Sequence, residues 1–323
     1  MKAIVQDSYG SADVLQLKDI DPPRIGDDEV LVRVHAAGVD PGVWHLMTGL
    51  PYLVRLMGYG LRSPKTNVLG FDVAGRVDAV GRNVTQLEVG DDVFGTCRGS
   101  FAEYACAEEE DLALKPGNVS FEQAAAVPVS GFTALQGVRD QGKVRAGQRV
   151  LIIGASGGVG SFAVQMAKSF GAEVTGVCST NKVELVRAIG ADHVIDYTRQ
   201  DFTETGDRWD LILDTAGARA VSHLRRTLTH RGTLVIVGAE GGNRWTGGIG
   251  RQLRAAALSP FVRHNLRMYI AQSNRNDLQF LRDLIESEKV TPVIDRTYPL
   301  AETAEAIRYL ARGHARGKVV ITV

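Results

Sequence analysis

A glycine-rich segment, Gly154-Ala-Ser-Gly-Gly-Val-Gly160, separates a run of apolar residues from the start of a helical pattern. In this context, Ala155-x-Gly157-x-x-Gly160 is a one-substitution variant of the G-x-G-x-x-G dinucleotide fingerprint. Glycine permits a positive φ angle and lets the backbone approach a pyrophosphate closely, while the helix N-terminus adds unpaired N–H groups. We therefore expect a dinucleotide to contact this segment, at Ala155, Ser156, Gly157, Gly158, Val159 and Gly160.

Strand-like segments alternate with helical ones around the glycine-rich segment. Five predicted strands are mostly continuous apolar runs, and a sixth follows, at residues 149–153, 173–177, 193–196, 209–213, 232–237 and 268–271. Such runs are typical of a parallel sheet that is covered by helices on both faces. The alternation predicts an α/β fold with a Rossmann doubly wound parallel sheet. It weakens the alternative that the glycine-rich segment is a turn without a ligand.

The chain changes character on both sides of this alternating region. Residues 1–120 consist of short strands separated by turn residues, which predicts an antiparallel β unit with little helix. The chain finishes with two amphipathic helical patterns and a strand at 318–323, and that strand needs a partner in the N-terminal unit. We therefore predict a Rossmann domain at 123–273, inserted into a mostly β domain made of 1–122 and 274–323.

The end of the second predicted strand indicates which nicotinamide cofactor binds. A site that prefers NAD places Asp or Glu there to bind the ribose 2′-OH, whereas this chain has Cys178-Ser-Thr-Asn-Lys182. Two hydroxyls and an ammonium suit a 2′-phosphate, so NADPH is predicted, although the hydroxyls also suit a helix cap. The predicted contacts are Cys178, Ser179, Thr180, Lys182 and, after the third strand, Tyr197. The alternative is packing for Tyr197, and for Cys178 a small residue at the end of a buried strand.

Charge and cysteine content argue against several other classes of protein. Lys plus Arg and Asp plus Glu both number 37, so the chain lacks the basic surplus that nucleic acids or anionic membranes favour. Three irregularly spaced cysteines suggest no disulfide framework and cannot form a four-cysteine zinc site. We recognise no secretory signal and no apolar stretch long enough to span a bilayer, so a cytoplasmic location is expected.

Several further motifs occur along most of the chain. They are Gly70-Phe-Asp-Val-Ala-Gly75, Val89-Gly-Asp-Asp-Val-Phe-Gly95, Gly99-Ser-Phe-Ala-Glu-Tyr104 and Gly313-His-Ala-Arg-Gly-Lys318. With these motifs and the glycine-rich segment, the chain resembles the zinc-free quinone oxidoreductase branch of the medium-chain dehydrogenase/reductase (MDR) superfamily. The resemblance implies a GroES-like substrate domain, a Rossmann domain and an active site in the cleft between them. It also implies hydride transfer from NADPH to a quinone or an α,β-unsaturated carbonyl.

The resemblance also bears on metal and cofactor ligands. Zinc-using relatives carry Cys near the position of Asp40 and Gly-His-Glu where this chain has Gly70-Phe71-Asp72, so no metal is expected. Matching positions imply that the nicotinamide half of the cofactor lies near Thr133 and near a strand end at 237–239, and that a C-terminal segment approaches the cofactor. The residues carried over are Thr133, Val237, Gly238, Ala239 and Arg316, with Lys318 beside the last of them.

Hydride transfer without zinc needs another group to stabilise the negative charge that develops on the substrate oxygen. Tyr52, in an aromatic-rich apolar segment, is a candidate hydrogen-bond donor, with packing as the alternative. Asp40, where relatives often have Asn, is the second catalytic candidate. We interpret Asp72, within a predicted strand, as a structural hydrogen-bond acceptor. The arginines of one late segment are interpreted as solvated surface: Arg251, Arg254 and Arg263.

Three functions are compatible with these patterns. The first is NADPH-dependent reduction of a quinone or enone. The second is a zinc-free dehydrogenase or reductase that acts on another alcohol and carbonyl pair. The third is a low-turnover NADPH-binding regulatory protein. For any of them we expect a homodimer, paired through the edge strand predicted near Met268–Ala271, because exposed sheet edges favour pairing.

Overall fold

The computed structural model describes residues 1–217, 219–238, 244–259 and 262–323. These residues form two compact units, each described separately below. The first unit is discontinuous and comprises Met1–Phe132, Ser273–Glu288 and Pro292–Val323. The second comprises Thr133–Gln272 with Lys289–Thr291. The first unit therefore extends beyond residue 122, through helix α3 (Phe121–Ala125) and into α4 (Pro128–Leu135).

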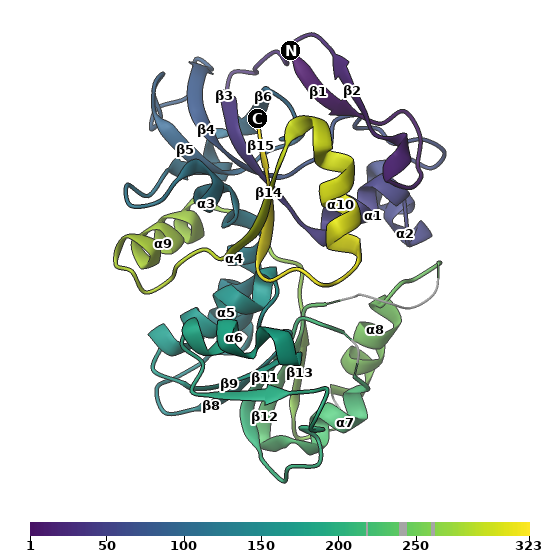
Figure 1. Ribbon diagram of the computed structural model, residues 1–323, viewed down its shortest axis with the longest axis vertical. Coiled ribbons are helices and arrows are strands. Elements are labelled where there is room, and N and C mark those ends of the chain that lie inside the picture. Colours follow the sequence, from purple (N-terminus) through teal and green to yellow (C-terminus); the bar gives the residue numbers. More distant parts are fainter. Residues whose placement is uncertain (218, 239–243, 260–261) are drawn as a thin grey trace. The chain divides into compact units, whose positions relative to one another are not determined.

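A seven-stranded sheet organises the first unit, with the strand order β14-β15-β3-β4-β5-β7 and β6 paired to β3. A separate antiparallel pair consists of β1 (Lys2–Val5) and β2 (Gln16–Asp19). The strands of the large sheet are β3 (Glu29–Val39), β4 (Asp72–Val80), β5 (Asp92–Thr96), β6 (Tyr104–Glu108), β7 (Leu112–Leu114), β14 (Ile294–Pro299) and β15 (Lys318–Thr322). Figure 1 shows β14 and β15 beside β3 although they are far from it in sequence.

The pairing of β15 confirms that the late strand joins the N-terminal β unit. It lies antiparallel to β3, with Val320 opposite Gly38, and parallel to β14. Two longer helices complete this unit, α9 (Arg275–Glu286) and α10 (Thr303–Ala311). The apolar faces predicted for these helices are buried, at Leu278, Leu281, Leu284 and Ile285 in α9 and at Ala306 and Ile307 in α10.

The expectation of little helix before residue 120 is wrong between β3 and β4. Helix α1 (Pro41–Thr48) begins after Asp40, whose carboxylate accepts the N–H of Gly42, with proline at the first helical position. Both features favour a helix start. Gly49, with a φ of 61°, ends the helix, and the short helix α2 (Tyr52–Val54) and the turn Arg55–Tyr59 follow.

The second unit contains a six-stranded sheet in the order β10-β9-β8-β11-β12-β13. All neighbouring strands are parallel, which confirms the Rossmann fold class, because this is the 3-2-1-4-5-6 order of a doubly wound sheet. The strands are β8 (Arg149–Ile153), β9 (Glu173–Cys178), β10 (His193–Asp196), β11 (Trp209–Asp214), β12 (Leu228–Ile236) and β13 (Asn265–Met268). The direction of winding reverses between β8 and β11.

Helices connect these strands on both faces of the sheet. They are α5 (Gly158–Ser169), α6 (Val183–Ala188), α7 (Val221–Arg226) and α8 (Ile249–Leu258). Right-handed connections that leave the centre in opposite directions place α5 and α6 on one face and α7 and α8 on the other, as the ribbon of this unit shows (Figure 1). None of the helices in the described ranges is long and apolar enough to cross a membrane.

The sixth strand lies earlier in the sequence than predicted. It ends at Met268, and the chain then leaves the sheet. The hydroxyl of Tyr269 donates to the carbonyl of Thr133, and the side-chain amide of Gln136 brackets the backbone of Gln272, with contacts of 2.8 and 3.1 Å. These bonds hold residues 269–272 against the helical segments of the same unit. Tyr269 and Ile270 are apolar but do not belong to the strand.

Candidate functional site

The glycine-rich segment forms a tight turn between β8 and α5. Gly154 has a φ of 81°, which favours glycine, and Gly157 is the N-cap residue of α5. The N–H groups of Gly154 and Ala155 both donate to the carbonyl of Val177 in β9, each at 3.1 Å. The turn is therefore fixed to two adjacent strands by its own backbone.

Three glycines of the turn, Gly154, Gly157 and Gly160, differ in the space around them. A Cβ atom on Gly160 would lie 2.1 Å from the Gly154 carbonyl oxygen, and one on Gly154 would lie 2.6 Å from Thr215 Oγ1. A Cβ atom on Gly157 would meet only the Gly154 oxygen, at 3.4 Å. Two glycines thus permit close packing, while the third leaves open space at the beginning of a helix whose first N–H groups have no intrahelical acceptor. This cradle fits a pyrophosphate group.

The other predicted residues of the turn contribute mainly their backbone. Ala155 and Ser156 are buried, with 0% and 4% of their surface exposed. The N–H of Ala155 already donates to Val177, so Ala155 supports the turn rather than offering a donor. The N–H groups of Gly158, Val159 and Gly160 belong to the first turn of α5. These are the donors that the helix leaves for a phosphate.

The predicted ribose contacts gather at the ends of β9 and β10. Cys178 pairs with Asp196 in the parallel register, and the N–H of Tyr197 donates to the Cys178 carbonyl at 3.1 Å. Tyr197 is exposed, whereas burial raises the pKa of the Cys178 thiol to about 11. Cys178 therefore ends a buried strand, and Tyr197 presents its ring at the surface beside it.

An acidic residue that the sequence analysis missed lies at this position. Asp196 is the last residue of β10, and its carboxylate accepts the hydroxyl of Thr180 at 2.6 Å and that of Thr198 at 2.7 Å. These hydrogen bonds, the one from Thr180 foremost, lower the pKa of Asp196. The Ser179 hydroxyl donates to the side chain of Asn181 at 2.9 Å, and Lys182 is half-buried. The sequence at the end of the second strand does not reveal Asp196, because this residue belongs to β10 and is placed beside Cys178 only by the parallel pairing of β9 and β10.

The carboxyl ends of β11 and β12 meet the glycine turn. The N–H groups of Val237 and Gly238 donate to the carbonyl of Asp214, at 3.0 and 3.2 Å. A Cβ atom on Gly238 would lie 2.5 Å from the Thr215 carbonyl oxygen, so only glycine fits there. Ala239 lies outside the described residues. Thr133 is half-buried at the start of the second unit, and its carbonyl accepts the Tyr269 hydroxyl.

In the first unit, three ionisable side chains are buried together. Asp72 accepts the Val129 N–H through Oδ1 and the Lys318 ammonium through Oδ2, both at 2.8 Å. The interpretation of Asp72 as a structural acceptor is confirmed. Lys318 is 2% exposed and bound to Asp72, so its side chain lies inside this unit. The nearby Arg316 is exposed, and its N–H donates to Asp295 at 3.0 Å.

Asp40 is the third buried group. One carboxylate oxygen accepts the Gly42 N–H at 2.8 Å, while Oδ2 is buried and has no hydrogen-bond partner in the part of the chain that the structure describes. Burial, and then the negative charge of Asp72, raise the pKa of Asp40 to about 6, although Lys318 opposes the shift. This side chain can therefore hold a proton close to neutral pH.

Tyr52 begins α2 and is half-buried. The guanidinium group of Arg55 lies 5.0 Å from its ring centre and 4.4 Å from that of Tyr9. The Tyr9 hydroxyl donates to the carbonyls of Tyr59 and Gly60 at 2.9 and 2.7 Å, and His45 Nδ1 lies 2.7 Å from the Leu50 carbonyl oxygen. Tyr9 and Arg55, which the sequence analysis missed, thus hold the segment that carries Tyr52.

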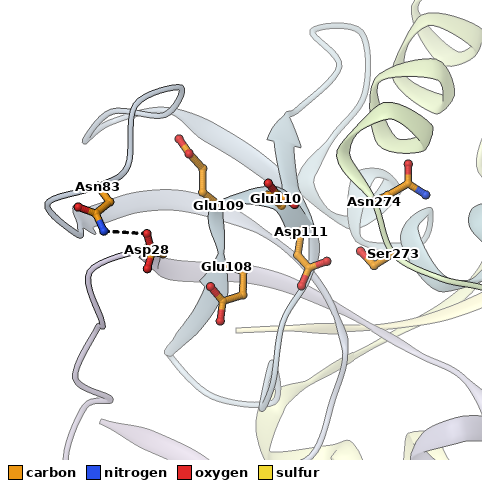
Figure 2. Close-up of a pocket in the computed structure, with 8 residues that line it drawn as sticks. All are labelled: Asp28, Asn83, Glu108, Glu109, Glu110, Asp111, Ser273 and Asn274. Carbon is orange, nitrogen blue, oxygen red and sulfur yellow. Dashed lines mark hydrogen bonds between the residues drawn. The ribbon is translucent and has the colours of Figure 1, made fainter.

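No group of three or more His, Cys, Asp or Glu side chains within the described ranges is arranged to hold a metal ion. An acidic pocket of about 470 Å³ does occur in the first unit (Figure 2). Its lining consists of Asp28, Asn83, Glu108, Glu109, Glu110, Asp111, Ser273 and Asn274. None of these was predicted as a site residue, and Figure 2 shows the acids pointing in different directions.

Comparisons with known proteins agree with this geometry. Residues 26–117 match the family described as the alcohol dehydrogenase GroES-like domain, and residues 189–321 match the one described as zinc-binding dehydrogenase. A 2-methylene-furan-3-one reductase from Solanum lycopersicum is 36% identical over 339 residues, covering 99% of this chain and 79% of that protein. A chloroplastic NADPH-dependent alkenal/one oxidoreductase from Arabidopsis thaliana is 36% identical over 340 residues, with the same coverage.

A solved structure extends the similarity to the whole fold. The quinone oxidoreductase from Coxiella burnetii aligns with a TM-score of 0.87 at 29% identity, over 100% of this chain and 99% of that one. The similarity therefore covers both units of the chain, including the discontinuous first one.

Proposed function

Because the chain belongs to the zinc-free quinone oxidoreductase branch of the MDR superfamily, we propose that it is an NADPH-dependent oxidoreductase that reduces quinones or α,β-unsaturated carbonyls. The observation that carries this proposal is the open cradle at Gly157, between β8 and α5, at the carboxyl edge of a doubly wound sheet. Ligands of such sheets bind at this edge, where the winding reverses. The names of two relatives, an alkenal/one oxidoreductase and a furanone reductase, support an enone as acceptor.

The residues at the ends of β9 and β10 support NADPH as the cofactor. Lys182 offers an ammonium group to the 2′-phosphate, and the ring of the nearby Tyr197 is exposed. The hydroxyl of Thr180 donates to Asp196, so it binds the phosphate only when it gives up that acceptor. Asp196 opposes this preference electrostatically, but its carboxylate is hydrogen-bonded to Thr180 and Thr198. When bound, NADPH supplies the hydride that adds to a carbon of the acceptor.

In the first unit we assign two roles to residues of the α1–α2 region. Tyr52 donates a hydrogen bond to the acceptor oxygen, which becomes negative as the hydride adds to carbon. Asp40, with its raised pKa, holds a proton that neutralises this oxygen or the neighbouring carbanion, so that hydride and proton together complete the reduction. We propose that this chemistry proceeds without zinc, because the resemblance implies that zinc-using relatives carry Cys near the position of Asp40 and His at that of Phe71.

Turnover with a panel of acceptors tests the proposal. Purified protein, NADPH and a quinone, an enone or a saturated aldehyde are mixed, and the loss of nicotinamide absorbance is followed with and without a strong chelator. Oxidation of NADPH by quinones or enones that the chelator leaves unchanged is the expected result. Turnover with saturated aldehydes alone would indicate a different alcohol and carbonyl pair, and tight binding without turnover would indicate a regulatory protein.

We also propose that the protein is a homodimer paired through β13. This strand forms one edge of the six-stranded sheet, and exposed apolar side chains lie at its end, with Met268 39% and Ile270 80% exposed. Exposed edges with apolar side chains favour pairing with another chain. A cytoplasmic location stays a prediction, and one of the named relatives is chloroplastic.

A further inference from the structure

The interpretation of Arg251 as solvated surface is wrong, because its side chain is largely buried and paired with an acidic residue. From α8, its Nη2 atom donates to the Oδ2 atom of Asp214, the last residue of β11. The Asp214 side chain is 1% exposed, and that of Arg251 is 17% exposed. Arg254, on the same helix, is exposed and serves below as a control residue.

The ion pair lies at the middle of the carboxyl edge of the sheet. Asp214 is opposite Ile153 of β8 and opposite Ile236 of β12 in the parallel registers. Its Oδ1 atom accepts the N–H groups of Ala216 and Gly217, at 3.2 and 3.0 Å. Asp214 therefore fixes both the turn after β11 and the guanidinium group of Arg251 at one place.

This place adjoins the glycine turn. Thr215, the next residue after Asp214, donates its N–H and its hydroxyl to the carbonyl of Ile153, at 3.1 and 2.8 Å. Gly154 follows Ile153 directly, and β8 and β11 are the two strands between which the winding reverses. In doubly wound sheets, β8 to β10 correspond to the half that binds the adenosine part of a dinucleotide, and β11 to β13 to the other half.

Among the described residues, two nitrogen atoms of the Arg251 guanidinium group have no hydrogen-bond acceptor. Nε and Nη1 of Arg251 are buried and have no hydrogen-bond partner among the residues that the structure describes. A guanidinium group cannot lose its proton under ordinary conditions, so both N–H groups remain donors, and buried donors without acceptors are unfavourable. A phosphate group is an anionic acceptor that arginine side chains bind well.

From this arrangement we propose that Arg251 is a cofactor-binding residue. Nη2 holds Asp214, and Nη1 donates to an oxygen of the phosphate on the nicotinamide side of the NADPH pyrophosphate. The proposal rests on the proposed function, since it requires a dinucleotide at the glycine turn. It assigns to α8 a contact that is independent of the 2′-phosphate, and therefore common to NADPH and NADH.

Binding measured by calorimetry tests this assignment in the full-length protein. Arg251→Lys keeps a positive charge for Asp214 but removes the guanidinium nitrogen that donates to the phosphate, and Arg254→Lys is the matched control. We expect Arg251→Lys to weaken NADPH and NADH by the same factor, about 10- to 100-fold, which is the range for a hydrogen bond to a charged group. Adenosine 2′,5′-bisphosphate lacks the phosphate on the nicotinamide side, so we expect Arg251→Lys to bind it as tightly as the unaltered chain does. Arg254→Lys should bind all three ligands with unchanged affinity.

Two results would overturn the assignment. The first is an Arg251→Lys protein that binds NADPH as tightly as the unaltered chain does. The second is an equal loss of affinity for adenosine 2′,5′-bisphosphate, which would indicate a general structural role for Arg251. An unaltered chain that binds neither NADPH nor NADH would overturn the proposed function itself, and so the two failures are distinguishable.

Discussion

Lys318 Nζ lies 2.8 Å from Asp72 Oδ2, and both side chains are almost completely buried, at 2% and 0% exposure. The pair joins β15 to β4, two strands separated by β3 in the sheet. Asp72 also accepts the Val129 N–H, which connects the same carboxylate to the start of α4. One carboxylate therefore holds together three segments of the first unit that are distant in sequence.

Removal of the lysine should therefore destabilise the first unit strongly. Lys318→Met leaves Asp72 buried without its counter-charge, and breaking a buried pair in this way costs about 3–5 kcal/mol. The free energy of unfolding, measured with urea, gives the size of the loss. Arg76→Met, in the exposed Arg76–Asp92 pair, is the control and should cost at most about 1 kcal/mol. Equal losses for the two variants would contradict the role given to the buried pair.

Asp40 should make stability depend on pH in the acidic range. Its pKa is raised from 3.8 in the unfolded chain to about 6 in the folded protein, so the folded protein binds the proton more tightly. The free energy of unfolding then falls, by an amount on the order of 3 kcal/mol, as the pH rises from about 4 to about 6, and it is constant above that range. Asp40→Asn keeps a suitable N-cap residue and should flatten this slope. Urea titrations of both proteins between these pH values measure it, and parallel curves would refute the prediction.

The motif glycines should separate folding from cofactor binding. Gly157 has an ordinary extended conformation (φ −84°, ψ 179°) with open space where a side chain would lie, so Gly157→Val should leave thermal stability nearly unchanged. It should weaken NADPH by about 10-fold or more, because the methyl groups occupy the phosphate position. Gly160→Val should instead destabilise the fold by about 1–3 kcal/mol through its clash with Gly154. Tight NADPH binding by Gly157→Val would show that the cradle is not the phosphate site.

Charges at the ends of β9 and β10 should set the choice between NADPH and NADH. Lys182→Glu should weaken NADPH by about 10-fold while it leaves NADH nearly unaffected, because only NADPH carries the 2′-phosphate. Asp196→Asn should strengthen the binding of NADPH, because it removes a negative charge beside Thr180 and retains a hydrogen-bond acceptor for that hydroxyl. Dissociation constants of both cofactors measured side by side decide the matter. A parallel change in both would show that these residues do not read the 2′-phosphate.

The edge strand should govern the oligomeric state. Light scattering of the purified protein should give the mass of a dimer, and Ile270→Asp should shift it toward the monomer because a charge is placed at the proposed interface. Leu56→Asp replaces another exposed apolar residue, 70% exposed and located in the other unit, and should leave the mass unchanged. A monomeric unaltered protein would remove β13 from consideration as an interface.

Local patterns were sufficient to predict the Rossmann sheet, because its strands are apolar runs and its central turn requires glycine. The same patterns placed the last strand of that sheet too late. The residues after Met268 are also apolar, and only their hydrogen bonds with Thr133 and Gln136 show that they leave the sheet. Helix α1 was missed although Asp40 and Pro41 form a helix start, because the surrounding segment was read as strands and turns.

The charged residues of the site were harder to predict than the glycines. Asp196 and Arg251 act at positions that are fixed by parallel pairing and by a distant helix, and neither relationship leaves a signal in the neighbouring sequence. The sequence around Arg251 does not show that this side chain is paired. The one indication is Asp214, an acidic residue directly after an apolar run, which is expected to need a cation when it is buried. Pairing of Lys318 with Asp72 is similarly invisible until β15 is placed in the sheet.

The position of β15 between β14 and β3 has a consequence for synthesis of the chain on the ribosome. The second unit has emerged as far as Gln272, all but its last three residues, while the first unit still lacks α9, α10 and two of its strands. Domains usually form in the order in which they emerge, but here the unit that begins first must wait for the one encoded in its middle. Until β15 is synthesised, the nascent first unit holds Asp72 without its counter-charge, and the edge of β3 that β15 covers has no partner strand.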